Sequence, residues 1–367
     1  MINRELFVNR EEQFQARLIE NAVDLWIIEE PVHLYYFTGL SLSVGLLLIS
    51  QKSSILFLDS RYWEMGSGDS FHVLSLFSEK NVHSWIEQSF PQDEICWSLS
   101  ERKSLLCSYR KWQSRWKKSR YHATYVGNDS LEKQLLYKDA EERRRLEEAA
   151  TLNERGMRFA LSLLKEGIME REIAFALEFF WKREAEVNLS FPLHIAFGEN
   201  SSRPHHKAGS RKLQRDQIVL LDMGVCLRGY HSDMTRTFFW GSISSKFEEV
   251  YEVVLLAQEE AIAACHLGRP LYELDKIARE IIVKKGFGEY YVHALGHGIG
   301  LEIHESPTIH ADKRENLLIQ PGLAFTIEPG IYIPKWGGVR IEDTLFITES
   351  GVNNLCPFSK HPIIEKM

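Results

Sequence analysis

The sequence predicts two domains, an α/β domain with a central sheet followed by a larger α+β domain. The chain has 367 residues, which at roughly 150 residues per domain corresponds to about two domains. Short apolar runs alternate with helix-like segments in the first third, whereas the rest is rich first in helix-forming residues and then in strand patterns. Apolar residues make up 44% and charged residues 26%, which is typical of globular proteins.

Three short apolar runs predict the strands of the first domain. Each is bounded by polar or turn-forming residues, as expected in a central sheet, and together they cover residues 24–28, 44–49 and 54–58. The turn-forming residues 127–130 follow a further strand-like piece and predict the end of this domain. We therefore expect an N-terminal domain of residues 1–128 and a second domain of residues 129–367.

The second domain is predicted to begin with helices and to end with antiparallel strands. Its first part is dense in Glu, Arg, Leu and Ala, which favour helices. From residue 191 onward, short apolar runs alternate with Gly and Pro. The predicted helices cover residues 131–164, 170–184, 248–267 and 271–285, and the strands that follow extend to about residue 346.

Charge, hydropathy and cysteine usage exclude several functional classes. The chain has 51 acidic and 44 basic residues and a net charge of −7, which disfavours binding of a nucleic-acid backbone. No apolar run reaches the length of about 18 residues that a membrane-spanning helix needs. The five cysteines are scattered and form no CxxC pair, which argues against a disulfide framework and a thiolate zinc site. We expect a cytoplasmic protein with no membrane or nucleic-acid partner.

The segment 110–120 is the one basic run that needs a separate interpretation. It holds six basic residues, two tryptophans and no acidic residue. Interleaved aromatic and basic residues are compatible with nucleic-acid binding. The acidic total and the lack of a nucleic-acid motif favour a solvated helix face whose tryptophans pack inward.

The first pair of carboxylates, Asp222 and Asp233, lies on two strand-like runs within residues 218–239. A two-residue loop at positions 227–228 places the two aspartates opposite each other, and a loop shifted by one residue makes them diagonal neighbours on one face. Like charges in either position destabilise a sheet unless something compensates them. A divalent cation is the natural compensation.

The second pair, Glu328 and Glu342, repeats this arrangement. The two residues are an even number of positions apart and flank turn-forming residues 334–338. A loop with an odd number of residues therefore sets both side chains on one face. Glu328 lies in an apolar context and precedes a proline, which suits a buried carboxylate.

A glycine-rich segment between the two pairs carries His293 and His297. The four-residue spacing is that of a helical zinc site, but the alternating glycines make a helix unsuitable there. The segment also lacks the lysine and the spacing of a phosphate-binding loop. Each residue taken alone has an ordinary structural explanation. The functional argument depends on the ordered set of Asp222, Asp233, His297, Glu328 and Glu342.

The order of these five residues and their local motifs resembles the pita-bread metallopeptidases, which include methionine aminopeptidase, prolidase and Xaa-Pro aminopeptidase. Residues 33–39 and 56–62 are similar to the creatinase-type domain of the proline-specific members. The resemblance implies an α/β creatinase-like N-terminal domain and an α+β pita-bread catalytic domain.

By this resemblance the five residues hold two divalent metal ions. Asp222 would bind one metal, His297 and Glu328 the other, and Asp233 and Glu342 would bridge them. Four carboxylate charges match the charge of two divalent ions, and the predominance of oxygen ligands favours Mn²⁺, with Co²⁺ or Zn²⁺ as alternatives.

The resemblance also assigns active-site roles to His205, His293, His304 and Arg340. Neutral packed histidines are the alternative for the first three residues. Arg340 would lie next to the bridging glutamate, although pairing with Asp343 or another carboxylate explains it equally well.

The predicted activity is that of an Xaa-Pro aminopeptidase, which releases the residue before a proline. A peptidase that reads the backbone N–H after the cleaved bond cannot use proline, because proline has none. The hypothesis is a hydroxide activated by two metals, Glu328 as general base, His304 and His293 as oxyanion and leaving-group stabilisers, and His205 as a substrate-orienting residue.

Two alternatives stay open at this point. The closest is an Xaa-Pro dipeptidase (prolidase), which accepts only dipeptides, and the second is a pita-bread binding module without catalysis. We expect peptides with proline in the second position as substrates and a homo-oligomer, either a dimer or a tetramer, as the assembly.

Overall fold

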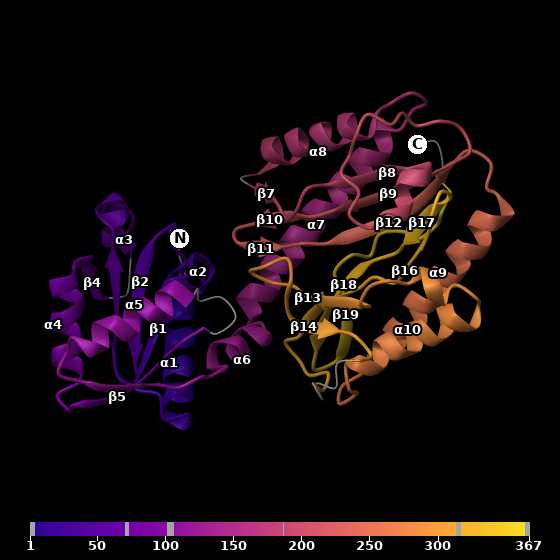
Figure 1. Ribbon diagram of the computed structural model, residues 1–367. Coiled ribbons are helices and arrows are strands. Elements are labelled where there is room, and N and C mark those ends of the chain that lie inside the picture. The colour runs from indigo at the N-terminus through magenta and orange to yellow at the C-terminus, as the bar shows by residue number, and fades with distance from the viewer. Residues whose placement is uncertain (1–3, 70–72, 101–105, 186, 313–316, 364–367) are drawn as a thin grey trace. The chain divides into compact units, whose positions relative to one another are not determined.

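The computed structural model describes residues 4–69, 73–100, 106–185, 187–312 and 317–363, and the chain divides into two compact units, Met1–Leu135 and Leu136–Met367 (Figure 1). The division lies at the end of helix α6 (Ser130–Leu136), later than the predicted boundary between residues 128 and 129. This helix packs with the first unit because Leu131 is fully buried and the Gln134 amide donates to the carbonyl of Arg10 at 2.8 Å.

The first unit contains a six-stranded mixed sheet in the order β4-β3-β2-β1-β5-β6. Neighbouring strands β1, β2 and β3 pair antiparallel, whereas β4, β5 and β6 join the sheet by parallel pairing. The three predicted strands are confirmed. The strands are β1 (Leu25–Ile28), β2 (Gly45–Ser50), β3 (Ser54–Leu58), β4 (Val73–Leu76), β5 (Glu94–Leu99) and β6 (His122–Tyr125).

Helices cover both faces of this sheet because its strands are apolar on both sides. Phe14 of α1 packs edge-on against Trp26 of β1, with ring centroids 5.2 Å apart. On the other face, Trp112 and Trp116 of α5 are buried in one cluster with Ile27. The inward packing predicted for the tryptophans of the basic segment is therefore confirmed. The other elements are α1 (Arg4–Glu20), α2 (Pro31–Thr38), the 3-10 turn η1 (Ser60–Tyr62), α3 (Trp63–Asp69), α4 (Glu79–Ser89) and α5 (Leu106–Lys117).

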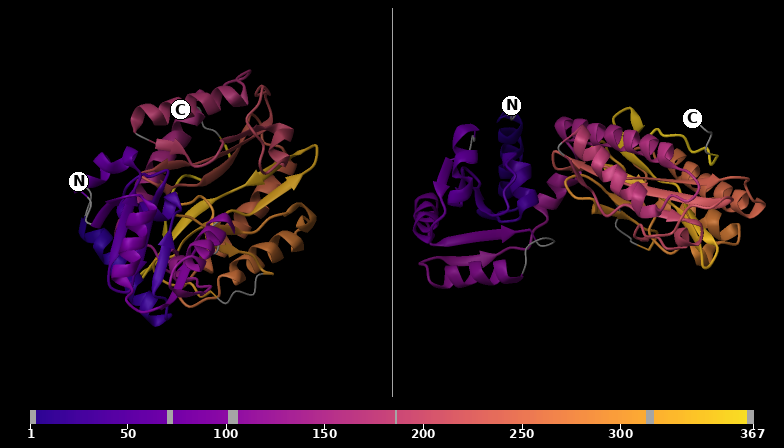
Figure 2. Two further views of the ribbon diagram at one scale, coloured as in Figure 1. Left: turned by 60° about the vertical axis from the view of Figure 1, so that its left-hand side comes forward. Right: turned by 90° about the horizontal axis from the view of Figure 1, so that it is seen from above.

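Two helix pairs border the strands of the second unit (Figures 1 and 2). Helix α7 begins at a capping box, in which Asp139 accepts from the Glu142 N–H at 2.8 Å and Glu142 accepts from the Asp139 N–H at 3.0 Å. This cap divides the long predicted helical region into α6 and α7. The helices are α7 (Ala140–Leu163), α8 (Glu170–Glu184), α9 (Ser245–Ala263) and α10 (Tyr272–Lys284), with 3-10 turns η2 (Gly198–Ser202) and η3 (Gly288–Tyr290).

The strands between the helix pairs are antiparallel, as predicted for an α+β domain. One sheet has the order β12-β9-β8, a second β14-β13-β15-β18-β19, a third β11-β10-β7, and β16 pairs with β17. The strands are β7 (Val187–Leu189), β8 (His194–Phe197), β9 (Gln217–Met223), β10 (Val225–Leu227), β11 (Tyr230–His231), β12 (Met234–Trp240), β13 (Gly296–Gly298), β14 (Glu305–Ile309), β15 (Ala324–Ile327), β16 (Gly330–Ile333), β17 (Gly337–Arg340), β18 (Asp343–Thr348) and β19 (Gly351–Asn354).

The main core of the second unit joins one helix pair to these strands. Phe247 and Leu274, from α9 and α10, are fully buried in one cluster with Phe325 and Ile327 of β15. The strands that carry the predicted site are thus fixed from behind by a close-packed apolar layer. Within the described residues, no helix is both long enough and apolar enough to cross a membrane.

Candidate metal centre

The first hairpin sets Asp222 and Asp233 on one face as diagonal neighbours. Asp222 of β9 lies opposite Thr235 of β12, and Leu227 lies opposite Tyr230. The loop is therefore the pair Arg228-Gly229, whose φ angles of 50° and 81° are those of a tight two-residue turn. The loop predicted at 227–228 is therefore wrong by one residue. The alternative, a loop shifted by one residue that makes the two aspartates diagonal neighbours, is confirmed.

The second hairpin places Glu328 and Glu342 across from each other at the junction of two strand pairings. Ile327 pairs with Asp343 on one side, and Gly330 pairs with Arg340 on the other. The Glu328 N–H donates to the Leu295 carbonyl at 2.8 Å and the Glu342 N–H to the Thr235 carbonyl at 3.1 Å. The second hairpin is thereby tied both to the histidine segment and to the strand that follows Asp233.

His297 lies on β13, between two glycines that allow close strand packing. A Cβ on Gly296 would lie 1.9 Å from the Thr326 carbonyl oxygen, and one on Gly298 would lie 2.1 Å from the Ser306 carbonyl oxygen. The segment is a strand and not a helix, as predicted. His297 Nδ1 faces the Gly298 carbonyl at 3.1 Å, which leaves Nε2 for the site.

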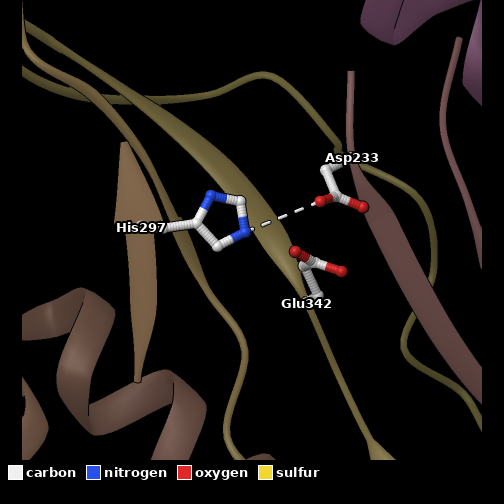
Figure 3. Close-up of side chains that lie close together, drawn as sticks. All are labelled: Asp233, His297 and Glu342. Carbon is white, nitrogen blue, oxygen red and sulfur yellow. Dashed lines mark ion pairs between the residues drawn. The ribbon is translucent and has the colours of Figure 1, made fainter. Parts of the chain in front are cut away.

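The side chains of these elements converge (Figure 3). His297 Nε2 lies 3.7 Å from Asp233 Oδ2 and 3.3 Å from Glu328 Oε1. Ligand atoms of Asp233, His297 and Glu342 all lie within 4.8 Å of one another. The structure therefore brings predicted ligands from three separate parts of the sequence into one cluster.

Three carboxylate oxygens of the cluster have no hydrogen-bond partner among the described residues. They are buried atoms of three different residues: Asp222 Oδ1, Asp233 Oδ1 and Glu342 Oε1. A buried unpaired carboxylate oxygen is costly to leave unsatisfied. Several such oxygens beside one imidazole nitrogen form a donor set that suits divalent cations, so these residues fit the metal that the sequence predicts.

The pKa values of three carboxylates of the cluster are shifted in different directions. Burial, and after it the neighbouring carboxylates, raise the pKa of Asp233 and of Glu342 well above their ordinary values. Burial opposes ionisation of Asp222 as well, but Arg340 and His194 lower its pKa. Bound cations would favour the ionised form of all four groups.

A cavity of about 700 Å³ opens beside the carboxylates. The His304 ring stands edge-on to the His297 ring, with centroids 4.2 Å apart. The cavity wall also carries apolar residues, among them Phe191 and Val292. All nine predicted site residues line it: His205, Asp222, Asp233, His293, His297, His304, Glu328, Arg340 and Glu342.

Arg340 connects Asp222 to the cavity wall. Its Nη2 donates to Asp222 Oδ2 at 2.5 Å and its Nη1 to the Tyr332 hydroxyl at 2.6 Å. That hydroxyl lies 3.0 Å from His293 Nε2. Arg340 thus pairs with a carboxylate of the cluster, whereas Asp343 binds other cations.

His205 belongs to a loop that one buried carboxylate holds at both ends. Glu170, the first residue of α8, is 0% exposed. Its Oε1 accepts from the Phe197 N–H at 2.9 Å, and its Oε2 accepts from the Gly209 N–H at 2.9 Å and lies 2.8 Å from His206 Nε2. The loop that presents His205 is therefore anchored independently of the carboxylates around His297.

Two residues at the site were missed by the sequence reasoning. His194 lies directly opposite Asp222 in the β8–β9 pairing, and its Nδ1 is 2.9 Å from Asp222 Oδ2. Tyr332 contacts both His293 and Arg340. Tyr332 is an even number of positions from Glu328, which could have placed it on the same face. No signal in the sequence pairs His194 with Asp222.

Comparison with known protein families matches both units of the chain. The family model of metallopeptidase family M24 matches residues 144–349, and the family model of the Creatinase/Prolidase N-terminal domain matches residues 10–115. An Xaa-Pro dipeptidase of Pyrococcus furiosus is 36% identical over 341 residues, which cover 92% of this chain and 94% of that protein.

Two solved structures of other proteins have a similar fold over nearly the whole length of this chain. The structure of an Xaa-Pro dipeptidase from Bacillus anthracis has a TM-score of 0.88 and 31% identity, and the match covers 97% of this chain and 99% of that one. The structure of an X-Pro aminopeptidase from Thermotoga maritima has a TM-score of 0.85 and 29% identity, and the match covers 95% and 99%.

Proposed function

Because the chain belongs to metallopeptidase family M24 and carries a Creatinase/Prolidase N-terminal domain, we propose that it is an Xaa-Pro dipeptidase dependent on two divalent metal ions. The observation that carries the metal dependence is the cluster of three buried carboxylates, the partly buried Glu328 and one imidazole, in which three carboxylate oxygens have no partner among the described residues. The Pyrococcus furiosus relative and the Bacillus anthracis structure are both named Xaa-Pro dipeptidases. These names support the dipeptidase alternative better than the aminopeptidase that the sequence predicted.

The metal ligands in this proposal are Asp222, Asp233, His297, Glu328 and Glu342. Oxygen ligands outnumber the single nitrogen, which favours Mn²⁺ over Co²⁺ and Zn²⁺. When bound, divalent ions polarise the peptide carbonyl and make a water molecule more acidic. Such chemistry acts on the carbonyl and needs no N–H after the cleaved bond, so it is suited to a bond before proline.

The protein's own groups would position the peptide and move protons. Glu328 is the proposed general base. Burial, and after it the neighbouring His297, lower the pKa of His304, so a neutral ring can donate one hydrogen bond to the substrate. His293 is engaged at both ring nitrogens, by the Ala294 carbonyl at 2.7 Å and the Tyr332 hydroxyl at 3.0 Å. We therefore assign it a role in shaping the cavity, and we assign substrate orientation to His205.

Hydrolysis of three short peptides tests this function. The metal-free protein would be reconstituted with Mn²⁺ and incubated with Ala-Pro, Ala-Pro-Ala and Ala-Ala. We expect hydrolysis of Ala-Pro alone, because the proposed enzyme accepts only dipeptides that end in proline. Comparable release of alanine from Ala-Pro-Ala would identify an aminopeptidase. No bound metal after reconstitution, together with no hydrolysis of any peptide, would support the binding-module alternative. The homo-oligomer and the cytoplasmic location stay predictions.

A further inference from the structure

His194 occupies a distinctive position in the sheet that carries the first carboxylate pair. Asp222 lies on the central strand β9, with His194 directly opposite on β8 and Thr235 directly opposite on β12. Directly paired residues of neighbouring strands project to the same face of a sheet. The His194 ring therefore stands beside the Asp222 carboxylate, and both residues line the cavity.

The two oxygens of Asp222 have different surroundings. Oδ2 lies 2.9 Å from His194 Nδ1 and accepts from Arg340 Nη2 at 2.5 Å. Oδ1 is buried and has no partner in the part of the chain that the structure describes. Two protein donors thus converge on one oxygen and leave the other available for a ligand.

We propose that His194 is a positioning residue of the metal centre, whose Nδ1–H holds Asp222 Oδ2 and thereby directs Oδ1 toward the metal. The proposal rests on the proposed function in one respect, since it takes Asp222 as a metal ligand. An ionised carboxylate only accepts hydrogen bonds, so the pairing requires the proton on Nδ1 of the imidazole. A hydrogen-bonding partner behind a ligating carboxylate fixes the orientation of that ligand before the metal arrives.

His205 is a natural control for this role. Its ring lies edge-on to that of His194, with centroids 5.6 Å apart, and it lines the same cavity. Within the described residues, no hydrogen bond joins it to a carboxylate of the cluster. A change at His205 therefore alters the wall of the same cavity without removing a donor from Asp222.

Mn²⁺ binding to the metal-free full-length protein tests the proposal by titration calorimetry. His194→Phe keeps a ring but removes the donor, and we expect Mn²⁺ to bind roughly 10- to 100-fold more weakly, as is usual when such a partner is lost. His194→Asn places an amide N–H near the position of Nδ1, so we expect it to bind within a few-fold of wild type. His205→Phe should bind Mn²⁺ like the wild type but hydrolyse peptide more slowly.

The outcomes separate this proposal from the proposed function. Wild-type protein that binds no Mn²⁺ would refute the metal centre itself. Wild-type protein that binds Mn²⁺, with His194→Phe binding it equally well or more tightly, would refute only the role of His194. If circular dichroism shows that the phenylalanine variant is unfolded, His194→Ala gives the same comparison with a smaller side chain.

Discussion

Glu342 and Asp343 are neighbours in the sequence and both are buried, yet their surroundings are opposite. Glu342 faces the carboxylates of the proposed metal centre, where Oε2 accepts from the Thr235 hydroxyl at 2.7 Å and Oε1 has no partner among the described residues. Asp343 faces away from it, where Oδ1 accepts from Arg236 at 2.7 Å and Oδ2 from Lys360 at 2.8 Å. The amides of two further residues complete the shell of Asp343: Gln258 and Asn354.

The protonation of the two carboxylates follows from this difference. Burial, followed by the charges of Glu328 and Asp222, raises the pKa of Glu342 well above its ordinary value. Burial acts on Asp343 too, but the cations of Arg236 and Lys360 lower its pKa. A buried carboxylate that is fully paired within the protein supports the fold. One that lies without an ionic partner among like charges is protonated more easily and would be stabilised in its ionised form by a bound cation, which makes Glu342 a candidate functional residue.

Asp343→Asn should destabilise the fold, because Asp343 is the carboxylate that is fully paired within the protein. Removing the carboxylate charge leaves the guanidinium of Arg236, which is 0% exposed, without its ionic partner. We expect the free energy of unfolding to fall by about 3–5 kcal/mol, as is usual when one partner of a buried ion pair is removed. Chemical denaturation of the metal-free protein measures this loss. A loss as small as that of an ordinary surface substitution would show that Asp343 is not the structural member.

Glu342→Gln should abolish most of the peptidase activity and leave the fold intact. The side chain keeps its size, but it loses the charge that the proposed metal centre requires. We expect the rate of Xaa-Pro hydrolysis to fall by at least about 10²–10³-fold, as for the loss of a transition-state-stabilising group. Circular dichroism should be unchanged. Hydrolysis near the wild-type rate would contradict the role of Glu342 as a metal ligand.

The spacing along the predicted strands placed the two carboxylate pairs, whereas the roles of the histidines and of Arg340 were predicted from the family resemblance alone. The even spacing of Glu328 and Glu342 places both on one face if the loop has an odd number of residues, and the structure has such a loop at 334–336. The loop of the first hairpin was not predictable, because Arg228 adopts a positive φ of 50°, which its residue type does not signal. The alternating glycines beside His297 argued against a helix, and the structure has a strand there whose two glycines leave no room for a Cβ.

Features that depend on tertiary contacts could not be derived from the sequence. The pairing of His194 with Asp222 joins strands separated by a long connection that carries no turn signal of a hairpin. The hydrogen bond from Gln134 to Arg10, which ties helix α6 to the first unit, is likewise not visible in the sequence. Dipeptidase and aminopeptidase could not be separated from the metal ligands, which the family resemblance assigns to both activities.

The pH dependence of the free energy of unfolding, measured in a chelating buffer, distinguishes Glu342 from Asp343 by the smallest of the expected effects. A carboxyl group whose pKa is higher in the folded than in the unfolded state contributes stability below its unfolded pKa, and this contribution is lost as pH rises through the folded pKa. The raised pKa of Glu342 therefore makes the wild type lose stability relative to Glu342→Gln as pH rises above about 4.3, the ordinary value for Glu.

Asp343 should give the opposite dependence. Its pKa is lowered in the folded state, so its contribution is present above about 3.9, the ordinary value for Asp, and is lost as pH falls through the folded pKa. The stability deficit of Asp343→Asn should therefore shrink at acidic pH, whereas the stability advantage of Glu342→Gln should grow toward neutral pH. Urea denaturation between pH 3 and pH 7 measures both differences, with the range chosen to bracket these ordinary values. Adding Mn²⁺ should reverse the advantage of Glu342→Gln, because only the wild type has the complete ligand set. If the stability differences of both variants followed the same pH trend, the pKa values of Glu342 and Asp343 would not be shifted in opposite directions by folding.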